Sequence, residues 1–404
     1  MSFSFAGIIR PVAFNPRKAG PEAGLRARRN LRWRVEEYRQ VGDMPPTPPP
    51  HPHLPGRGPV INPANRFVRI EVEADPEWLN TEAAENTPPP SPATRFYVDG
   101  TESLLTPNDS PDVGPGWGLN CYRGCEHGCA YCFARPYHEY LGWSSGIDFE
   151  TKILVKTRAP ELLRAELSSA QWRPEPIMMS GITDCYQPAE RHFKLTRRCL
   201  EVMAEFRQPV GIITKNFLVT RDLDILADLA RHQCAMVNMS VTTLDADLAG
   251  KLEPRAARPE HRLRAIRLLA DAGVPVNVLV APVIPGLTEH EIPAILDAVA
   301  AAGAQCASYV LLRLPHAVKD VFLHWLETHE PGKKERVLAR IRELRGGKLY
   351  DSTFGARLRG EGIFAEQIKQ LFAIAARRAG LNRAEIKLSP AHFRRPGGVQ
   401  LEMF

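Results

Sequence analysis

The chain has 404 residues, more than one compact domain usually needs, which favours one large catalytic domain with extensions. Its 44% hydrophobic and 24% charged residues are typical of a globular chain and exclude a wholly disordered protein or one dominated by membrane spans. The 52 basic and 46 acidic residues give a net charge of +6. No apolar run approaches the roughly 18 residues of a membrane-spanning helix, and the first residues lack the apolar core of a secretory signal. We therefore predict a cytoplasmic protein that does not contact a membrane.

The amino-terminal part of the chain is basic and rich in proline. Residues 1–40 hold nine Lys or Arg and three Glu, and 17 of the 36 prolines lie in the first 100 residues. Because proline removes an amide donor and fixes φ, residues 1–95 are predicted to be mostly extended and irregular, with a strand over 66–72. The basic arm suits the phosphate backbone of DNA, while a solvated tail that keeps the protein soluble is an equal alternative.

Short apolar runs alternate with amphipathic stretches from about residue 115 onward. The predicted strands cover 118–122, 153–155, 177–180, 210–214, 236–242, 276–281 and 307–312. The predicted helices between them cover 161–170, 193–206, 222–231, 262–272 and 289–301, and residues 333–380 are predicted to be further helices rich in Arg and Lys. This alternation indicates parallel β/α units, either an incomplete barrel of six strands with one extra strand or a doubly wound sheet. In both layouts the active site lies at the carboxyl ends of the strands.

Four cysteines lie within twelve residues, with Cys121 in the first of these strands and the other three directly after it. Cys125, Cys129 and Cys132 have the spacing C-x3-C-x2-C, in which each thiolate can hold one iron of a cubane [4Fe–4S] cluster and leave the fourth iron open. Two alternatives use Cys121 as a fourth ligand. One is a structural zinc site, and the other is a closed electron-transfer cluster.

The cysteine motif resembles a known superfamily. Cys125-x3-Cys129-x-Tyr131-Cys132 is similar to the signature of the radical S-adenosylmethionine (radical SAM) enzymes, and Asn120–Arg135 resembles the branch that contains spore photoproduct lyase. Other stretches resemble bacterial members described as DNA repair photolyase-like, namely Asn108–Pro111, His138–Gly142, Asp148–Glu150 and Thr183–Glu190. The resemblance implies an α/β fold with a partial (β/α)6 barrel of the radical SAM type over 96–345. It would be flanked by a Pro-rich irregular extension over 1–95 and a helical extension over 346–404.

The resemblance also implies the chemistry. A [4Fe–4S] cluster on Cys125, Cys129 and Cys132 would bind SAM and cleave it reductively to a 5′-deoxyadenosyl radical that abstracts a hydrogen atom, in a lyase-like reaction. The predicted substrate is a nucleic acid, as in repair of a DNA lesion, and the expected electron donor is a flavodoxin or ferredoxin. The alternatives are radical modification of RNA, protein or a small molecule, and an Fe–S electron carrier or sensor without SAM chemistry.

The same resemblance assigns the SAM contacts. Tyr131 occupies the position beside the adenine, unless it is only a loop aromatic that packs on the barrel rim. Ser180 and Thr183 end a strand where relatives contact the methionine amino group, although Ser-Gly-Ile-Thr stands here in place of Gly-Gly-Glu.

Three further polar residues follow later strands. Lys215 is predicted to pair with the SAM carboxylate, or else to be a lysine at the barrel rim. Ser240 and Thr242 alternate along one strand and so face one side, where they would meet either the ribose hydroxyls or neighbouring strands. Glu253 with Arg255 or Arg258 is expected to line the site mouth as an ion pair or a ribose contact, or else to form a surface salt bridge that introduces the next helix.

Three expectations concern catalysis and partners. Cys185 is the candidate for a cysteine that returns hydrogen to the substrate radical, with a buried small apolar residue as the default interpretation. The final residues resemble a peptide that binds the bacterial sliding clamp, through Gln400, Leu401, Met403 and Phe404, or else they fold back on the chain. No aromatic stripe is predicted that would stack on single-stranded nucleic acid.

Overall fold

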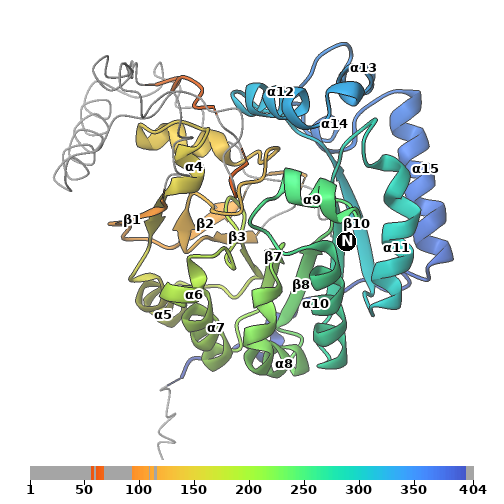
Figure 1. Ribbon diagram of the computed structural model, residues 1–404. Helices are drawn as coiled ribbons and strands as arrows, with labels where there is room; N and C mark the ends of the chain where they lie inside the picture. Colours follow the sequence, from red (N-terminus) through yellow and green to blue (C-terminus); the bar gives the residue numbers. More distant parts are fainter. Residues whose placement is uncertain (1–55, 59–60, 68–92, 109, 113–115, 397–404) are drawn as a thin grey trace, which may run out of the picture.

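The computed structural model describes residues 56–58, 61–67, 93–108, 110–112 and 116–396 (Figure 1). The basic arm, most of the strand predicted over 66–72 and the carboxyl-terminal clamp-like peptide lie outside the described residues. The proposed division at residues 95 and 345 therefore stays a prediction.

A seven-stranded sheet forms the framework of the protein. Its order is β10-β9-β8-β7-β6-β3-β2, in which β2 runs antiparallel to β3 and all other neighbours are parallel. The strands are β2 (Leu105–Asn108), β3 (Gly116–Leu119), β6 (Ile177–Met179), β7 (Val210–Thr214), β8 (Ala235–Ser240), β9 (Val276–Val283) and β10 (Cys306–Leu311). The six parallel strands follow one another in chain order, as in a (β/α) barrel and not as in a doubly wound sheet, where the order reverses. The predicted partial barrel of six parallel strands is confirmed, but its extra strand is β2, which was not among the predicted strands.

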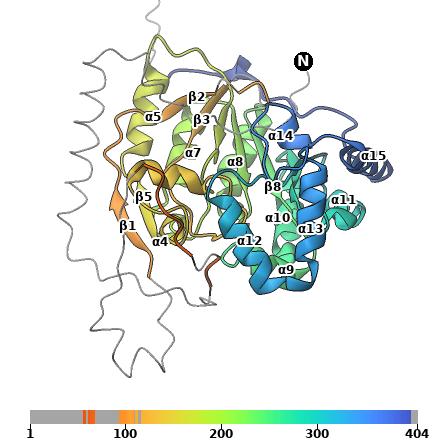
Figure 2. The same cartoon turned by 90° about the horizontal axis from the view of Figure 1, so that it is seen from above.

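Amphipathic helices connect the parallel strands and cover the outer face of the sheet (Figures 1 and 2). In the longer helix between β6 and β7 the buried residues Cys199, Leu200, Met203 and Phe206 recur at intervals of one or three residues, which places them on one face of the helix. The helices of this layer are α5 (Ala159–Ser168), α6 (Glu190–Phe193), α7 (Leu195–Phe206), α8 (Leu223–Arg231), α10 (Pro259–Asp271) and α11 (Ile292–Ala301), whereas α9 (Ala246–Leu252) packs with the cysteine loop.

Further helices follow the last strand. They are α12 (Val318–His329), α13 (Lys334–Glu343), α14 (Ala356–Arg359) and α15 (Ile363–Arg378). The longest, α15, packs along α11 at the β10 edge of the sheet, where Phe372 contacts Tyr309 with ring centroids 5.0 Å apart (Figure 1). Within the described part of the chain, no helix has the length and apolar character needed to cross a bilayer.

A small second sheet supports the cysteine motif. It has the order β1-β5-β4, with β1 (Arg95–Val98), β5 (Lys152–Val155) and β4 (Tyr122–Arg123). The run 118–122, predicted as one strand, is divided in the structure, because β3 ends at Leu119 and Tyr122 pairs with β5. Residues 153–155 form a strand as predicted, but they belong to this small sheet and not to the barrel. The alternating pattern identifies a strand but does not specify its neighbours.

Candidate functional site

The three cysteines of the motif lie in a loop that begins at the carboxyl end of the barrel strand β3. Gly124 and Gly128 adopt φ values of +82° and +70°, in the region that favours glycine. A Cβ atom on Gly124 would come within 2.9 Å of the Phe149 carbonyl oxygen, and one on Gly128 within 2.8 Å of Glu150 Oε2. The two glycines therefore allow the loop to turn tightly against the segment 149–150.

Cys125, Cys129 and Cys132 fit an iron–sulfur cluster by their chemistry. All three are free cysteines, and burial raises the pKa of each thiol above its usual value. Cys125 and Cys132 pack with Ala134 and Phe149, while Cys129 packs with Tyr131. Among the described residues, no three Cys, His, Asp or Glu side chains form a group suited to a single metal ion. Three thiols on one short loop are the ligand set of a cubane with one open iron.

Cys121 does not face the other three cysteines of the motif. Its sulfur lies 3.8 Å from the sulfur of Cys199 on α7, and both side chains are completely buried in the core between the sheet and that helix. This contact gives Cys121 a packing role and favours the three-cysteine arrangement over both alternatives that need a fourth thiolate.

The pairing of Cys121 with Cys199 leads to a prediction. Cys121→Ala is expected to leave iron binding unchanged and to lower the free energy of unfolding by about 1–3 kcal/mol, because it removes a buried sulfur from a packed core. Iron content after reconstitution and urea denaturation measure the two effects. Cys199→Ala removes the other sulfur of the same contact. It should likewise leave iron binding unchanged and lower the free energy of unfolding. Loss of iron from the Cys121 variant alone would instead identify Cys121 as a ligand.

A buried arginine fixes the backbone of the cysteine loop. The guanidinium of Arg135 donates from Nε and Nη2 to the carbonyl oxygen of Cys129, at 3.0 and 2.8 Å, and from Nη1 to the carbonyl of Gly146 at 2.8 Å. It also pairs with Glu150 at 2.6 Å, and neither side chain is exposed to solvent. Arg135 is the last residue of the stretch Asn120–Arg135 that resembles the family. Its spacing from Glu150 in the sequence did not indicate that the two side chains pair and fix the cysteine loop.

A second group of contacts joins the cysteine loop to the ends of β6 and β7. Asp184 accepts hydrogen bonds of 2.8 Å from the Thr214 hydroxyl and from the Lys215 amide, and lies 3.4 Å from Nδ1 of His127 in the cysteine loop. Burial acts to raise the pKa of Asp184, but His127 and the backbone hydrogen bonds outweigh it, so that the pKa lies below its usual value. The Gln187 side chain bonds the Glu126 amide at 2.9 Å and the Gly124 carbonyl at 3.1 Å. The stretch Thr183–Glu190, singled out by resemblance, thus positions the cysteine loop.

Tyr131 is held in a buried polar network. Its hydroxyl donates to Glu253 and lies 3.2 Å from the Thr242 hydroxyl, which in turn lies 2.8 Å from Glu253. Burial would raise the pKa of Glu253, but Arg262, Lys215 and the hydrogen bonds together lower it to about 2. The expected pairing of Glu253 is wrong in its partner, because Arg262 pairs with Glu253 while Arg255 pairs with Glu126 at 3.1 Å. Glu253 directly follows α9, and its side chain points into the protein. It does not form a surface salt bridge before the next helix.

The remaining residues predicted to contact SAM lie at the same end of the barrel. The Lys215 ammonium sits over the Tyr131 ring, 5.9 Å from its centroid. Ser240 and Thr242 are both buried, at the end of β8 and just beyond it. The Ser180 hydroxyl accepts the Cys185 amide at 2.8 Å, whereas the buried Thr183 hydroxyl has no hydrogen-bond partner among the described residues. Thr183 is therefore better placed than Ser180 to bind an incoming polar group.

Cys185 is buried in the core behind this layer. Only 2% of its surface is exposed, and burial together with Asp184 raises the pKa of its thiol well above the usual value. A neutral thiol is the form that can give up a hydrogen atom, but the side chain packs with Cys121 and Cys199 in one apolar cluster. Its predicted catalytic role stays a prediction.

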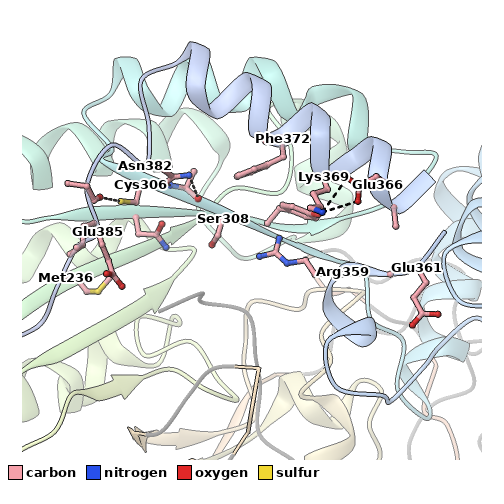
Figure 3. A pocket seen from close by; sticks show the side chains of 18 of the residues that line it. Met236, Cys306, Ser308, Arg359, Glu361, Glu366, Lys369, Phe372, Asn382 and Glu385 are labelled. Atoms are coloured by element: carbon pink, nitrogen blue, oxygen red, sulfur yellow. Dashed lines mark hydrogen bonds and ion pairs between the residues drawn. The ribbon is translucent and has the colours of Figure 1, made fainter. Parts of the chain in front are cut away.

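A cavity of about 820 Å³ lies apart from the cysteine loop (Figure 3). Its strand residues, such as Met236, Asn277 and Cys306, come from the amino-terminal parts of β8, β9 and β10, and Arg359 and Phe372 close it from the carboxyl-terminal segment. The site assembled around the cysteines lies at the opposite ends of the strands.

Comparisons with known proteins agree with this geometry. The sequence model described as the radical SAM superfamily matches residues 119–299. An uncharacterised protein of Mycobacterium tuberculosis strain H37Rv is 36% identical over 244 residues, which cover 60% of this chain and 71% of the relative. An uncharacterised protein of Methanocaldococcus jannaschii is 29% identical over 187 residues, or 46% of this chain and 66% of the relative.

Solved structures share the fold. A spore photoproduct lyase variant with bound AdoMet and dinucleoside spore photoproduct superposes with a TM-score of 0.51 and 15% identity, covering 71% of this chain and 80% of that one. Another variant of spore photoproduct lyase gives a TM-score of 0.50 with 16% identity over the same shares. With three free cysteines at the carboxyl end of a parallel partial barrel, and with these relatives, the chain belongs to the radical SAM superfamily.

Proposed function

We propose that this radical SAM enzyme holds its cluster on Cys125, Cys129 and Cys132 and acts on a nucleic acid. The observation that carries the proposal is the loop after β3, where three free thiols at C-x3-C-x2-C spacing lie beside a buried polar layer at the carboxyl ends of the strands. Such a layer can bind a polar cofactor without admitting bulk water.

The residues around the loop have distinct proposed tasks. When bound, a [4Fe–4S] cluster supplies the electron that cleaves SAM and so provides a radical able to abstract hydrogen. Thr183, with its unused hydroxyl, would bind the amino group of SAM, and Lys215 its carboxylate. Tyr131, fixed by Glu253 and Thr242, would form one wall of the adenine pocket. Ser240 would contact the ribose, and Cys185 would return a hydrogen atom to the substrate.

The nucleic-acid substrate is supported by two separate lines. A spore photoproduct lyase variant of the same fold has AdoMet and a dinucleoside spore photoproduct bound. In addition, the chain carries a net charge of +6, with nine basic and three acidic residues in its first 40. Positive charge of this kind strengthens binding to a phosphate backbone.

The decisive experiment is SAM cleavage measured with and without nucleic acid. The full chain would be reconstituted anaerobically with iron and sulfide, reduced with dithionite and given SAM, and 5′-deoxyadenosine would be quantified by chromatography. We expect 5′-deoxyadenosine to form slowly when no nucleic acid is added. Ultraviolet-irradiated DNA should increase its formation several-fold over untreated DNA. If RNA increases SAM cleavage in place of DNA, or if neither polymer does, while cleavage without a polymer is unchanged, DNA is not the substrate. The proposed SAM chemistry would still stand.

A further inference from the structure

We propose that a surface beside the cysteine loop binds an unpaired stretch of nucleic acid, with Arg313 taking a backbone phosphate and a row of aromatic rings stacking on the bases. We call it the aromatic–arginine face and define it by Phe133, Tyr137, Tyr140, Arg313 and Tyr350. This inference rests on the proposed nucleic-acid substrate and specifies where and in which form that substrate is held.

Arg313 is unusual among the buried arginines of the protein. It lies two residues beyond β10, at the catalytic end of the barrel, and only 7% of its surface is exposed. Its Nε and Nη1 atoms are buried and have no hydrogen-bond partner among the described residues. Burial lowers the pKa of its guanidinium, while Tyr350 acts on it through its charge and a side-chain hydrogen bond; Arg357 and Tyr137 also act on it, and none of these neighbours is a carboxylate.

The other buried arginines use their donors. Arg135 pairs with Glu150, Arg262 with Glu253 and Arg357 with Asp112. Arg345 forms no ion pair among the described residues but donates to the carbonyl oxygens of residues 312, 356 and 357, and Arg57 donates to the Glu150 carbonyl and the Thr94 hydroxyl. A buried cation without a counter-ion and with unused donors is costly, so such a group is retained where an anion completes it. A phosphate matches the planar fork of a guanidinium.

The unused nitrogens are screened from solvent in this structure. A phosphate that reaches them must displace a covering side chain instead of a water molecule. The ring of Phe133 is one such neighbour, because the guanidinium carbon of Arg313 lies 5.2 Å from its centroid. Phe133 directly follows Cys132 and packs against the cluster of Cys125, Ala134 and Phe149, so an anion bound here lies at the mouth of the cluster site.

Aromatic side chains extend from Phe133 along the segment that leads into η1 (Arg135–Leu141). Phe133, Tyr137 and Tyr140 have the spacing i, i+4 and i+7, and the rings of Tyr137 and Tyr140 are 6.4 Å apart. Tyr140 is 44% exposed and stacks on Phe67, itself 55% exposed, at 4.8 Å. The sequence did not predict this row of aromatic rings. In the structure, the ring of Phe67 from the distant amino-terminal segment completes the row.

The same residues lie close enough to act on one another. The pKa of Tyr137 is raised to about 12, mainly by burial, and Arg313, Tyr140 and Tyr350 all contribute to its electrostatic environment. Successive bases of a single strand stack on exposed rings, while a cation beside the rings neutralises the backbone, and each stacked base is worth about 1–3 kcal/mol. Bases paired within a duplex do not offer their faces to rings in this way, so the face fits an unpaired segment.

The test compares binding of a fluorescein-labelled single-stranded oligodeoxynucleotide by the reconstituted full chain and its variants, by fluorescence anisotropy over a salt series. Arg313→Gln is expected to weaken binding at least about tenfold and to lower the slope of log K against log salt by about 0.7, the share of one phosphate. Tyr140→Ala, which replaces an exposed ring and should not disturb the fold, is expected to weaken binding about 5- to 100-fold with an unchanged salt slope.

Arg231→Gln on α8 is the matched control, because it removes the same charge from a side chain that is 74% exposed and lies on the outer helix layer. It should bind like the wild type. If the wild type binds the strand but Arg313→Gln and Tyr140→Ala bind like Arg231→Gln, the aromatic–arginine face is wrong and the nucleic-acid substrate stands. If the wild type binds neither strand nor duplex, the substrate proposal itself fails. Equal, Arg313-dependent binding of a labelled polyglutamate peptide would also overturn the assignment to nucleic acid.

Discussion

Replacing Cys125 by alanine is expected to abolish formation of 5′-deoxyadenosine from SAM. Each thiolate of the C-x3-C-x2-C loop is predicted to hold a different iron, so the loss of one leaves a cubane without a complete set of protein ligands. The side chain is 7% exposed and packs with Ala134 and Phe149. The measurement is chromatography of the product after anaerobic reconstitution and reduction, with iron and sulfide quantified in the same samples.

The matched control is Cys121→Ala, which makes the same chemical change four residues earlier in the chain. Because the Cys121 sulfur contacts Cys199 and not the loop thiols, this variant should still produce 5′-deoxyadenosine. Product from Cys125→Ala at the wild-type rate would refute the assignment of the cluster ligands. A Cys121→Ala protein that keeps iron but makes no product would show that packing beneath the loop, and not ligation alone, governs the reaction.

The sequence allowed the parallel strands to be predicted, and it proposes three cluster cysteines, because both depend on short spacings. To predict three thiols on one loop requires only the intervals between residues 125, 129 and 132. To predict the strands requires only the local alternation of apolar runs and amphipathic stretches. The helix at 318–329 was not anticipated, although its buried residues Val318, Val321, Phe322 and Trp325 recur with helical spacing. Proline and histidine residues just before it obscured the start of this pattern.

The contacts that position the site could not be predicted in the same way, because they join distant segments. Tyr131 meets Glu253 across 122 positions, and the His127 ring meets Asn216 across 89. Glu253 illustrates the difficulty, since arginines at 255 and 258 are nearer in the chain than its actual partner, Arg262. Local spacing identifies which residues carry chemistry, whereas tertiary packing decides which of them meet.

Arg135→Met is expected to have the largest effect on stability among variants outside the cysteines. Methionine fills part of the volume but leaves the Glu150 carboxylate completely buried without its ion pair, and it frees the Cys129 carbonyl that the guanidinium now binds. Breaking a buried pair from one side costs about 3–5 kcal/mol. Urea denaturation should show this loss, and the iron content after reconstitution should fall because the loop backbone between two predicted ligands is no longer fixed.

A double-mutant cycle separates the ion pair from the volume change. Arg135→Met combined with Glu150→Gln should cost less than the sum of the two single variants, because the double variant leaves no buried carboxylate. Arg164→Met is the matched control: its pair with Glu205 is equally short, at 2.5 Å, but the two side chains are 46% and 45% exposed. Since exposed pairs contribute about 0–1 kcal/mol, this variant should unfold close to the wild type. Equal losses from Arg135→Met and Arg164→Met would show that the buried pair does not hold the cysteine loop in place.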